Sequence, residues 1–575
     1  MNARSVARIA VFCSLTLMLP GAANAQGARP FDVVITNGRI IDGTGSPWYS
    51  GDVGIRDGRV AAIGVLSGAF RARTIDARGM VVAPGFIDML GQSEHTILVD
   101  PRLPSKIYQG ITTEITGEGG SAAPQNDATI KADESEYRHL RIKPDWRTFG
   151  QYFARLEKQG IGINFASYVG ATQVRAVVLG YDDRQPSAAQ LLEMQQLVRD
   201  AMTAGAVGVS SSLEYPPAPY AKTEELIALA TEAARFGGIY ATHMRSEGDA
   251  IIESIDETAR IGRAAHVPVE IWHLKIAGVT NYGRMPEVLA RINAARAAGV
   301  DIAADTYAYT AWSNGLSAFM PPWAHDGGNA RLVARLKDPA TRARIRKELL
   351  TPSKEWDNEW QEIAGPGAVM ITAVQNPKLV RFQGKRLNEI AAEWHKDPME
   401  ALFDFLIEDD GFTSVAVFGM SEPDVSLALQ QPWVAIDNDA SGTAPEGLLG
   451  QEHPHPRAYG TFPRVLRKYV REEKLLTLPD AIRKMSALPA QRMRLVDRGV
   501  LKEDMWADVV IFDPETIRDL ATFEDPNQLS QGMEYVLVNG VPVIDQGRMT
   551  GKLPGKVLRG PGYRPGPGPG PGPGP

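Results

Sequence analysis

Thiol chemistry is almost absent from this sequence. Its single cysteine, Cys13, lies in an N-terminal segment that we expect to be removed, so the mature chain would contain no cysteine. Disulfide bonds, cysteine nucleophiles and cysteine metal ligands are then excluded together. Any bound metal ion must be held by His, Asp or Glu side chains, or by a modified lysine.

An excess of positive charge is also missing. The chain has 61 Lys and Arg against 68 Asp and Glu, a net charge of −7, which gives no reason to expect nucleic acid or an anionic membrane as a partner. No long hydrophobic run follows the N-terminal segment, so we expect no membrane span. The sequence gives no indication of an oligomeric state.

The first 25 residues have the pattern of a secretory signal peptide. Basic Arg4 and Arg8 precede an apolar run, and the small residues of Ala23-Asn24-Ala25 fit a cleavage site before Gln26. The apolar run is short for a transmembrane helix. We therefore expect a mature protein in the periplasm or outside the cell.

Two β-rich segments lie near the two ends of the chain. Residues 26–82 contain short alternating runs separated by Asn-Gly and Asp-Gly pairs, and a similar texture returns in residues 495–558. We predict that both segments form one small β domain. The Gly/Pro-rich residues 559–575 are predicted to be a disordered tail, because such a sequence cannot pack a core.

Residues 83–494 alternate between helical and strand patterns. The helical pattern of residues 223–238 leads into the apolar run of residues 239–243, and the next units repeat this order. Such units predict an α/β fold with parallel strands, and about 400 residues suit a (β/α)8 TIM-like barrel with insertions. We predict an insertion around residues 318–400, which are rich in charged helical sequence.

Polar residues stand directly after several predicted strands, where the catalytic face of a βα barrel lies. Those that could share one site are Glu118, His243, His273 and Asp439. Two imidazoles from consecutive strands can converge with carboxylates from an early and a late strand. Neutral imidazole and carboxylate suit a divalent ion such as zinc, although a lone histidine at a strand end is more often structural.

Several long stretches carry a resemblance to a known family: THMRSEGD (242–249), IWHLKIAG (271–278), HPRAYGTFPRVL (455–466), AADTYAYTAWSNGLSAFMPPWA (303–324), GAVGVSSSLEYPP (205–217) and NFASYVGATQVR (164–175). They resemble the N-acyl-D-amino-acid deacylases of the amidohydrolase superfamily. The resemblance extends from about residue 31 to residue 558. It implies a barrel joined to a split β-sandwich, and a metal-dependent enzyme that hydrolyses the amide bond of small N-acyl amino acids.

The resemblance also implies roles for single residues. His243 and His273 correspond to the two histidines that hold a tightly bound zinc ion. Asp439 corresponds to the aspartate that acts as general base and then as general acid. Three further side chains correspond to residues that hold the carboxylate of the acylated amino acid: Lys275, Tyr215 and Arg457. An ammonium and a guanidinium are natural partners of a carboxylate.

The chain departs from the family pattern in two places. The family usually has His-x-His after the first strand, where this sequence has Leu90 and Gln92, so the first of two metal sites is predicted to be lost. The family also has a cysteine ligand after the second strand. An ungapped alignment places Gly119 there, and a shift of one residue places Glu118, the only nearby side chain able to coordinate.

We therefore predict one zinc ion per chain, held by Glu118, His243 and His273 with a fourth position open for water. A surface carboxylate is the alternative interpretation of Glu118. A carboxylated Lys275 bridging two metals is less favoured, because that lysine normally comes from an earlier strand. We also expect Arg245 and Glu247 to pair with each other in support of the site.

Other functions remain open at this point. A D-dipeptidase, or another amidase that includes cyclic amides among its substrates, would use the same metal chemistry. A ring substrate has no free carboxylate beside the scissile bond, so it would not need the proposed clamp. A binding protein that lost catalysis with the first metal site would carry no zinc.

Overall fold

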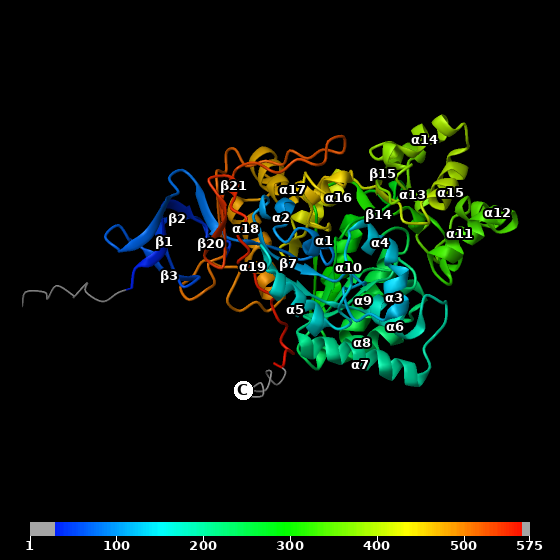
Figure 1. Ribbon diagram of the computed structural model, residues 1–575, viewed down its shortest axis with the longest axis horizontal. Helices are drawn as coiled ribbons and strands as arrows, with labels where there is room; N and C mark the ends of the chain where they lie inside the picture. The colour runs from blue at the N-terminus through cyan, green and yellow to red at the C-terminus, as the bar shows by residue number, and fades with distance from the viewer. Residues whose placement is uncertain (1–28, 566–575) are drawn as a thin grey trace, which may run out of the picture.

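The structure is a computed structural model that describes residues 29–565 (Figure 1). The predicted signal peptide and residues 566–575 of the predicted tail lie outside the described residues. Within the described range, no helix has both the length and the apolar character needed to cross a bilayer.

Parallel strands form a barrel in the centre of the molecule from two paired sheets, β6-β7-β8 and β9-β10-β11-β12-β13-β17, and a parallel bridge between Gly91 and Ala440 closes it. Among residues 29–565 the barrel has eight strand positions, with β8 and β9 sharing one. The strands are β6 (Phe86–Asp88), β7 (Ile111–Thr116), β8 (Asn164–Ser167) with β9 (Val169–Gly170), β10 (Gly208–Ser212), β11 (Ile239–His243), β12 (Val269–Ile271), β13 (Ile302–Thr306) and β17 (Val434–Ile436). The chain after β17 returns to the chain after β6, where Asp439 N donates to Leu90 O at 2.9 Å.

Helices surround this barrel and bury one face each. In α9, the residues at positions Ile251, Ile255, Ala259 and Gly262 are buried, a spacing that places them on one side of a helix. The helices packed outside the barrel are α5 (Phe149–Gln159), α6 (Ala171–Leu179), α7 (Ala188–Ala204), α8 (Thr223–Ala234), α9 (Ile251–Ala265), α10 (Met285–Ala297), α16 (Glu422–Leu429) and α18 (Leu478–Met485). The predicted TIM-like barrel is confirmed.

A separate β domain is built from both ends of the described chain (Figure 1, blue and orange-red strands on the left). Strand β5 pairs antiparallel with β18, joining the two segments, and apolar side chains such as Val53 and Val509 fill the core. The sheet contains β1 (Phe31–Ile40), β2 (Tyr49–Arg56), β3 (Arg59–Gly64), β4 (Arg71–Asp76), β5 (Val81–Pro84), β18 (Val509–Phe512), β19 (Met533–Val538), β20 (Val541–Asp545) and β21 (Arg548–Met549).

The chain leaves the barrel between β13 and β17 to form an insertion on the side far from the β domain (Figure 1, right). Its sheet, in the order β14-β16-β15, has two strands outside the predicted range of 318–400, so the insertion is wider than predicted. Its elements are β14 (Trp312–Gly315), α11 (Asn329–Lys337), α12 (Pro339–Leu349), α13 (Glu359–Glu362), β15 (Val369–Ala373), α14 (Leu387–Trp394), α15 (Pro398–Glu408) and β16 (Ser414–Val417).

The chain remains packed beyond residue 558, where the tail was predicted to begin. Gly560 N donates to Gly205 O at 2.8 Å, Arg564 N donates to Thr203 O at 3.0 Å, and the Arg559 guanidinium pairs with Glu157 at 2.7 Å. A side chain at position 560 would collide with the backbone of residue 206, so glycine permits this close approach.

A buried histidine in the insertion makes stability depend on pH. His325 Nε2 lies 3.0 Å from Ser317 O, and burial lowers the pKa of His325 to about 4. The unfolded chain takes up this proton below its usual pKa near 6.5, while the folded chain stays neutral until about 4. Stability is therefore expected to fall as pH falls through this window, by about 2 kcal/mol between pH 7 and 5 from this residue.

Urea unfolding midpoints of wild type and His325→Gln at pH 7 and pH 5 test this expectation. The variant should lose less stability than wild type between the two pH values. An equal loss in both proteins would show that His325 is not the source.

Candidate active site

A cavity of about 240 Å³ opens at the C-terminal ends of the barrel strands. A larger hollow of about 880 Å³ beside Trp323 and Arg344 contains none of the predicted site residues. The cavity at the barrel mouth is lined by all of them: Glu118, Tyr215, His243, His273, Lys275, Asp439 and Arg457.

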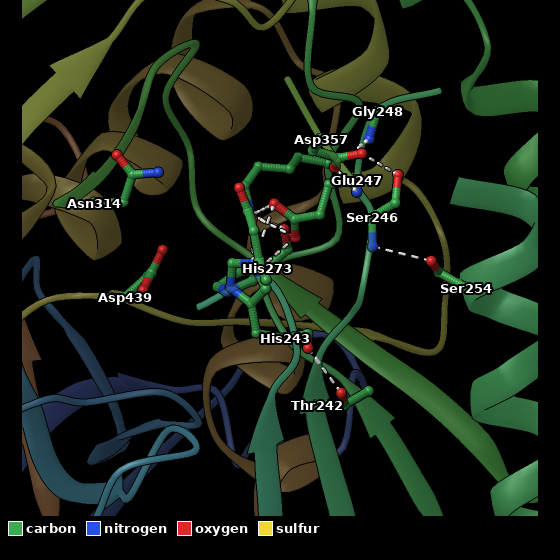
Figure 2. Close-up of polar contacts among 12 residues, drawn as sticks. Thr242, His243, Ser246, Glu247, Gly248, Ser254, His273, Asn314, Asp357 and Asp439 are labelled. Carbon is green, nitrogen blue, oxygen red and sulfur yellow. Dashed lines mark hydrogen bonds and ion pairs between the residues drawn. The ribbon is translucent and has the colours of Figure 1, made fainter. Parts of the chain in front are cut away.

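Three potential ligand atoms meet in this cavity. His243 ends β11, and His273 follows β12, so neighbouring strands bring the two rings together (Figure 2). His243 Nδ1 lies 2.9 Å from His273 Nε2, and Glu118 Oε1 lies 3.1 and 3.3 Å from these nitrogens. Ligands bonded to one tetrahedral zinc ion at 2.0–2.1 Å lie roughly 3.3 Å apart, so this spacing fits such an ion.

The far nitrogen of each ring contacts a carboxylate. His243 Nε2 lies 2.7 Å from Glu214 Oε2, and His273 Nδ1 lies 3.0 Å from Glu247 Oε1 and 2.7 Å from Lys275 Nζ. For His243, a carboxylate in this position holds the ring proton on Nε2 and leaves Nδ1 free to coordinate. His243 Nδ1, His273 Nε2 and the Glu118 carboxylate face one point, an arrangement that favours a cation.

The carboxylates also make this region favourable for positive charge. Burial alone lowers the pKa of His243, but the surrounding carboxylates, Glu247 foremost, raise it to about 10. Burial raises the pKa of Glu118, but its hydrogen bonds with both histidines outweigh this and hold the pKa well below its usual value. Glu118 is therefore an anion in this environment, and the donor set fits a divalent metal ion.

Two site residues have backbone conformations that favour glycine. His273 has φ of 38° and Asp439 has φ of 46°, in the left-handed region, which costs about 1–3 kcal/mol per residue. The fold compensates with fixed hydrogen bonds: His273 N donates to Asp305 Oδ1 at 2.6 Å, and Asp439 N donates to Leu90 O. The two side chains are thereby directed into the cavity instead of along their strands.

The two residues of the altered first motif have different environments. Leu90 is fully buried in an apolar cluster beneath the cavity. Gln92 Nε2 donates to Glu118 Oε2 at 2.6 Å and to Asp439 Oδ1 at 3.1 Å. The amide of Gln92 thus holds the two carboxylates in place as a neutral donor.

Asp439 faces the histidine pair and has a cationic neighbour (Figure 2). Its Oδ2 lies 2.6 Å from Arg457 Nη1, and both side chains are buried. Burial raises the pKa of Asp439, and Arg457 only partly opposes this. A carboxylate with a raised pKa can both accept and release a proton near neutral pH.

The predicted pair of Arg245 and Glu247 does not form. Arg245 points away from the cavity and contacts Glu257 through Nε at 2.9 Å and Nη2 at 3.0 Å. Glu247 points into the cavity, where its Oε2 lies 2.6 Å from Lys275 Nζ. Alternate residues of this extended segment face opposite ways, which the prediction did not consider.

The cavity has an acidic side that the sequence analysis missed. We call it the acidic wall, and it consists of Glu214, Asp357, Glu359 and Glu362. Glu214 follows β10, and the others come from α13 of the insertion and the residue pair before it. Glu214 could have been found by its place after a strand, but no strand end marks the other three, because the insertion brings them to the barrel mouth from far along the chain.

The barrel with imidazole and carboxylate donors at its strand ends defines a metal-dependent hydrolase. Residues 448–544 match the model of the amidohydrolase family. The chain is 36% identical to an N-acyl-D-glutamate deacylase of Alcaligenes xylosoxydans xylosoxydans over 92% of this chain and 96% of that protein. It is also 36% identical to a D-aminoacylase of the same organism, over 92% and 98%.

Solved structures agree with these relatives. A D-aminoacylase structure is matched with a TM-score of 0.77 at 36% identity, over 92% of this chain and all of that one. The N-acyl-D-glutamate deacylase of Bordetella bronchiseptica, complexed with zinc and a phosphonate inhibitor, is matched with the same score at 34% identity, again over 92% and 100%. The chain belongs to the N-acyl-D-amino-acid deacylase family of amidohydrolases. It is therefore an enzyme, and the predicted family is confirmed.

Proposed function

We propose that the protein is a secreted, zinc-dependent deacylase that hydrolyses the amide bond of N-acyl-D-amino acids, with one ion per chain. The observation that carries this proposal is the meeting of Glu118, His243 and His273, each histidine backed by a carboxylate. The zinc in the Bordetella relative and the D-amino acids named for the relatives support it.

The chain's own residues would divide the work as follows. A zinc ion held by the three donors would supply a water of lowered pKa and polarise the scissile carbonyl. Asp439 would take the proton of the attacking water and give it to the leaving nitrogen. Gln92 and Arg457 hold the two oxygens of Asp439, so its carboxylate keeps one orientation throughout.

We infer a single zinc ion per chain from the two residues that replace the histidines of the first metal motif, Leu90 and Gln92. Leu90 has no ligand atom and is buried, while Gln92 already bridges Glu118 and Asp439 through its amide nitrogen. An amide donor between two carboxylates supplies the electrostatic link that a second cation would otherwise provide.

Three side chains would hold the substrate carboxylate. Arg457 Nε is buried and has no hydrogen-bond partner among residues 29–565, so it is available to an acceptor. Lys275 Nζ lies within hydrogen-bond distance of Glu247, His273 Nδ1 and His273 O, so a substrate carboxylate would replace one of these acceptors. Tyr215 lies against the His243 ring with 4.7 Å between ring centres, which places it next to the proposed metal position.

Tyr215→Phe should raise KM for N-acyl-D-amino acids by roughly ten-fold and leave zinc content unchanged. The variant keeps the ring that packs on His243 and loses only a hydroxyl donor to a charged group, worth about 1.5 kcal/mol. Steady-state kinetics with an N-acyl-D-amino acid and with its C-terminal amide, which lacks the carboxylate, measure this directly. A KM that is unchanged, or raised equally for both substrates, would exclude Tyr215 from the carboxylate clamp.

A panel of N-acylated D- and L-amino acids, presented to purified protein with its zinc content measured, tests the function as a whole. We expect hydrolysis of D-configured members and about one zinc per chain. A metal-free protein that remains inert after zinc is added would favour a non-catalytic binding protein.

Export rests on the sequence of residues 1–25 alone. N-terminal sequencing of the protein recovered from the periplasm or the medium should begin at Gln26. Full-length protein confined to the cytoplasm would contradict the export proposal and leave the chemistry of the site untouched.

A further inference from the structure

We propose that the acidic wall binds a positively charged group of the substrate, an ammonium or a guanidinium. The inference rests on the proposed deacylase function and names a substrate class for the same cavity. A cationic group could come from a basic amino-acid side chain or from an aminoacyl group with a free amine. Both sources present the same chemistry to the wall.

The cavity's own cations are engaged elsewhere. Lys275 Nζ lies 2.6 Å from Glu247 Oε2, and Arg457 Nη1 lies 2.6 Å from Asp439 Oδ2. Among the described residues that line the cavity, no other lysine or arginine is present. The wall's three carboxylates from the insertion, Asp357, Glu359 and Glu362, therefore have no cationic partner among residues 29–565, while Glu214 contacts His243.

Glu359 supplies an unmet acceptor in this wall. Its side chain is 1% exposed, Oε1 accepts a hydrogen bond from Asn314 Nδ2, and Oε2 has no partner among residues 29–565. Asn314 Oδ1, which lines the same cavity, also has no partner in that range. A buried acceptor without a donor costs about 1–3 kcal/mol, so these two oxygens favour a ligand that donates hydrogen bonds.

Burial and mutual repulsion act on the same carboxylates. Burial, with the charge of Glu214 second, raises the pKa of Glu359 well above its usual value, and burial with neighbouring carboxylates does the same for Glu362. These raised pKa values indicate that the described residues supply too little positive charge near Glu359 and Glu362 to offset burial and repulsion. A cationic substrate group would relieve this repulsion and donate to the free oxygens at once.

The spacing of the wall's carboxylates from the insertion does not suit a second metal ion. Within residues 29–565, the groups of ligand atoms lying within 4.8 Å of one another are Glu118, His243 and His273, and Glu214, His243 and Glu247. Neither group contains a carboxylate from the insertion. Asp357 is occupied by backbone, since it accepts from Glu247 N at 2.8 Å and Gly248 N at 3.2 Å (Figure 2). Ammonium and guanidinium groups carry several N–H donors that point in different directions, so they can bind carboxylates that lie further apart than the ligands of a metal ion.

Two substrate pairs test the proposal on the zinc-loaded wild-type enzyme. Nα-acetyl-D-arginine and Nα-acetyl-D-citrulline differ in side-chain charge, and glycyl-D-leucine and N-propionyl-D-leucine differ in the charge of the acyl group. We expect kcat/KM to favour the charged member of one pair by at least about ten-fold, which also identifies the source of the cation. A neutral member hydrolysed as well as its charged partner in both pairs would overturn the proposal.

Variants test whether the acidic wall causes the preference for charged substrates. Glu359→Gln should lower the charged-to-neutral ratio of kcat/KM by about five-fold or more, since it removes the charge and keeps the shape. Glu355→Gln, an exposed residue four positions earlier that does not line this cavity, should leave the ratio as in wild type. A ratio unaffected by Glu359→Gln would overturn the assignment to the wall. Absence of turnover for all four substrates would instead sink the proposed deacylase function and this inference with it.

Discussion

Asp439→Asn should lower kcat by about 10³-fold or more while zinc content stays at the wild-type level. General acid–base catalysis contributes on the order of 10²–10⁴-fold, and Asp439 is the only carboxylate proposed to move protons here. Asparagine keeps the size of the side chain and can still accept from Gln92, but it cannot take a proton. Stopped or continuous amide-hydrolysis assays with metal analysis of the same samples measure both quantities.

Asp437→Asn is the matched control for this variant. Asp437 follows the same strand two residues earlier and is fully buried, but it does not line the cavity. Its substitution should cost less than about ten-fold in kcat, because it removes no group that contacts the substrate. Activity of Asp439→Asn above about one tenth of wild type would exclude Asp439 as the proton carrier.

Glu118→Gln is expected to abolish stoichiometric zinc binding together with activity. The amide is neutral, so it cannot offset the ion's charge, and it binds zinc far more weakly than a carboxylate. We expect the zinc affinity to fall by at least about 100-fold, measured by competition with a chelator. Two imidazoles would remain, which is fewer than the three protein ligands usual in a catalytic zinc site.

Glu362, a carboxylate of the same cavity, provides the control for Glu118→Gln. Glu362→Gln makes the same substitution in the acidic wall, outside both groups of ligand atoms, and should retain one zinc per chain. Zinc bound by Glu118→Gln as tightly as by wild type would show that Glu118 is a loop carboxylate and not a ligand.

The barrel and the strand-end residues could be predicted from sequence for one physical reason. Parallel strands place their C-terminal ends at one face, so His243, His273 and Asp439 had to lie near one another once the strands were assigned. The strand assignment was not enough to predict Glu118 as a ligand, because the family alignment alone left Gly119 as an alternative. The structure places Glu118 Oε1 within 3.3 Å of His243 Nδ1 and His273 Nε2, which carries the proposal that it is a ligand.

The remaining contacts depend on packing that no local pattern records. Gln92 reaches two carboxylates from distant parts of the chain, and Glu214 and Glu247 contact the far nitrogens of the histidines only after β10 and β11 are in place. The acidic wall needs the insertion folded over the barrel mouth. The error over Arg245 has the same origin, since its partner Glu257 lies on a helix that returns to it.

X-ray diffraction from crystals of the purified protein, recorded above and below the zinc absorption edge, tests the central claim most directly. The account predicts one anomalous peak per chain, at about 2 Å from His243 Nδ1, His273 Nε2 and a Glu118 carboxylate oxygen. A cavity without such a peak after zinc soaking would contradict it, as would a peak on the opposite side of His243 between Glu214 and Glu247.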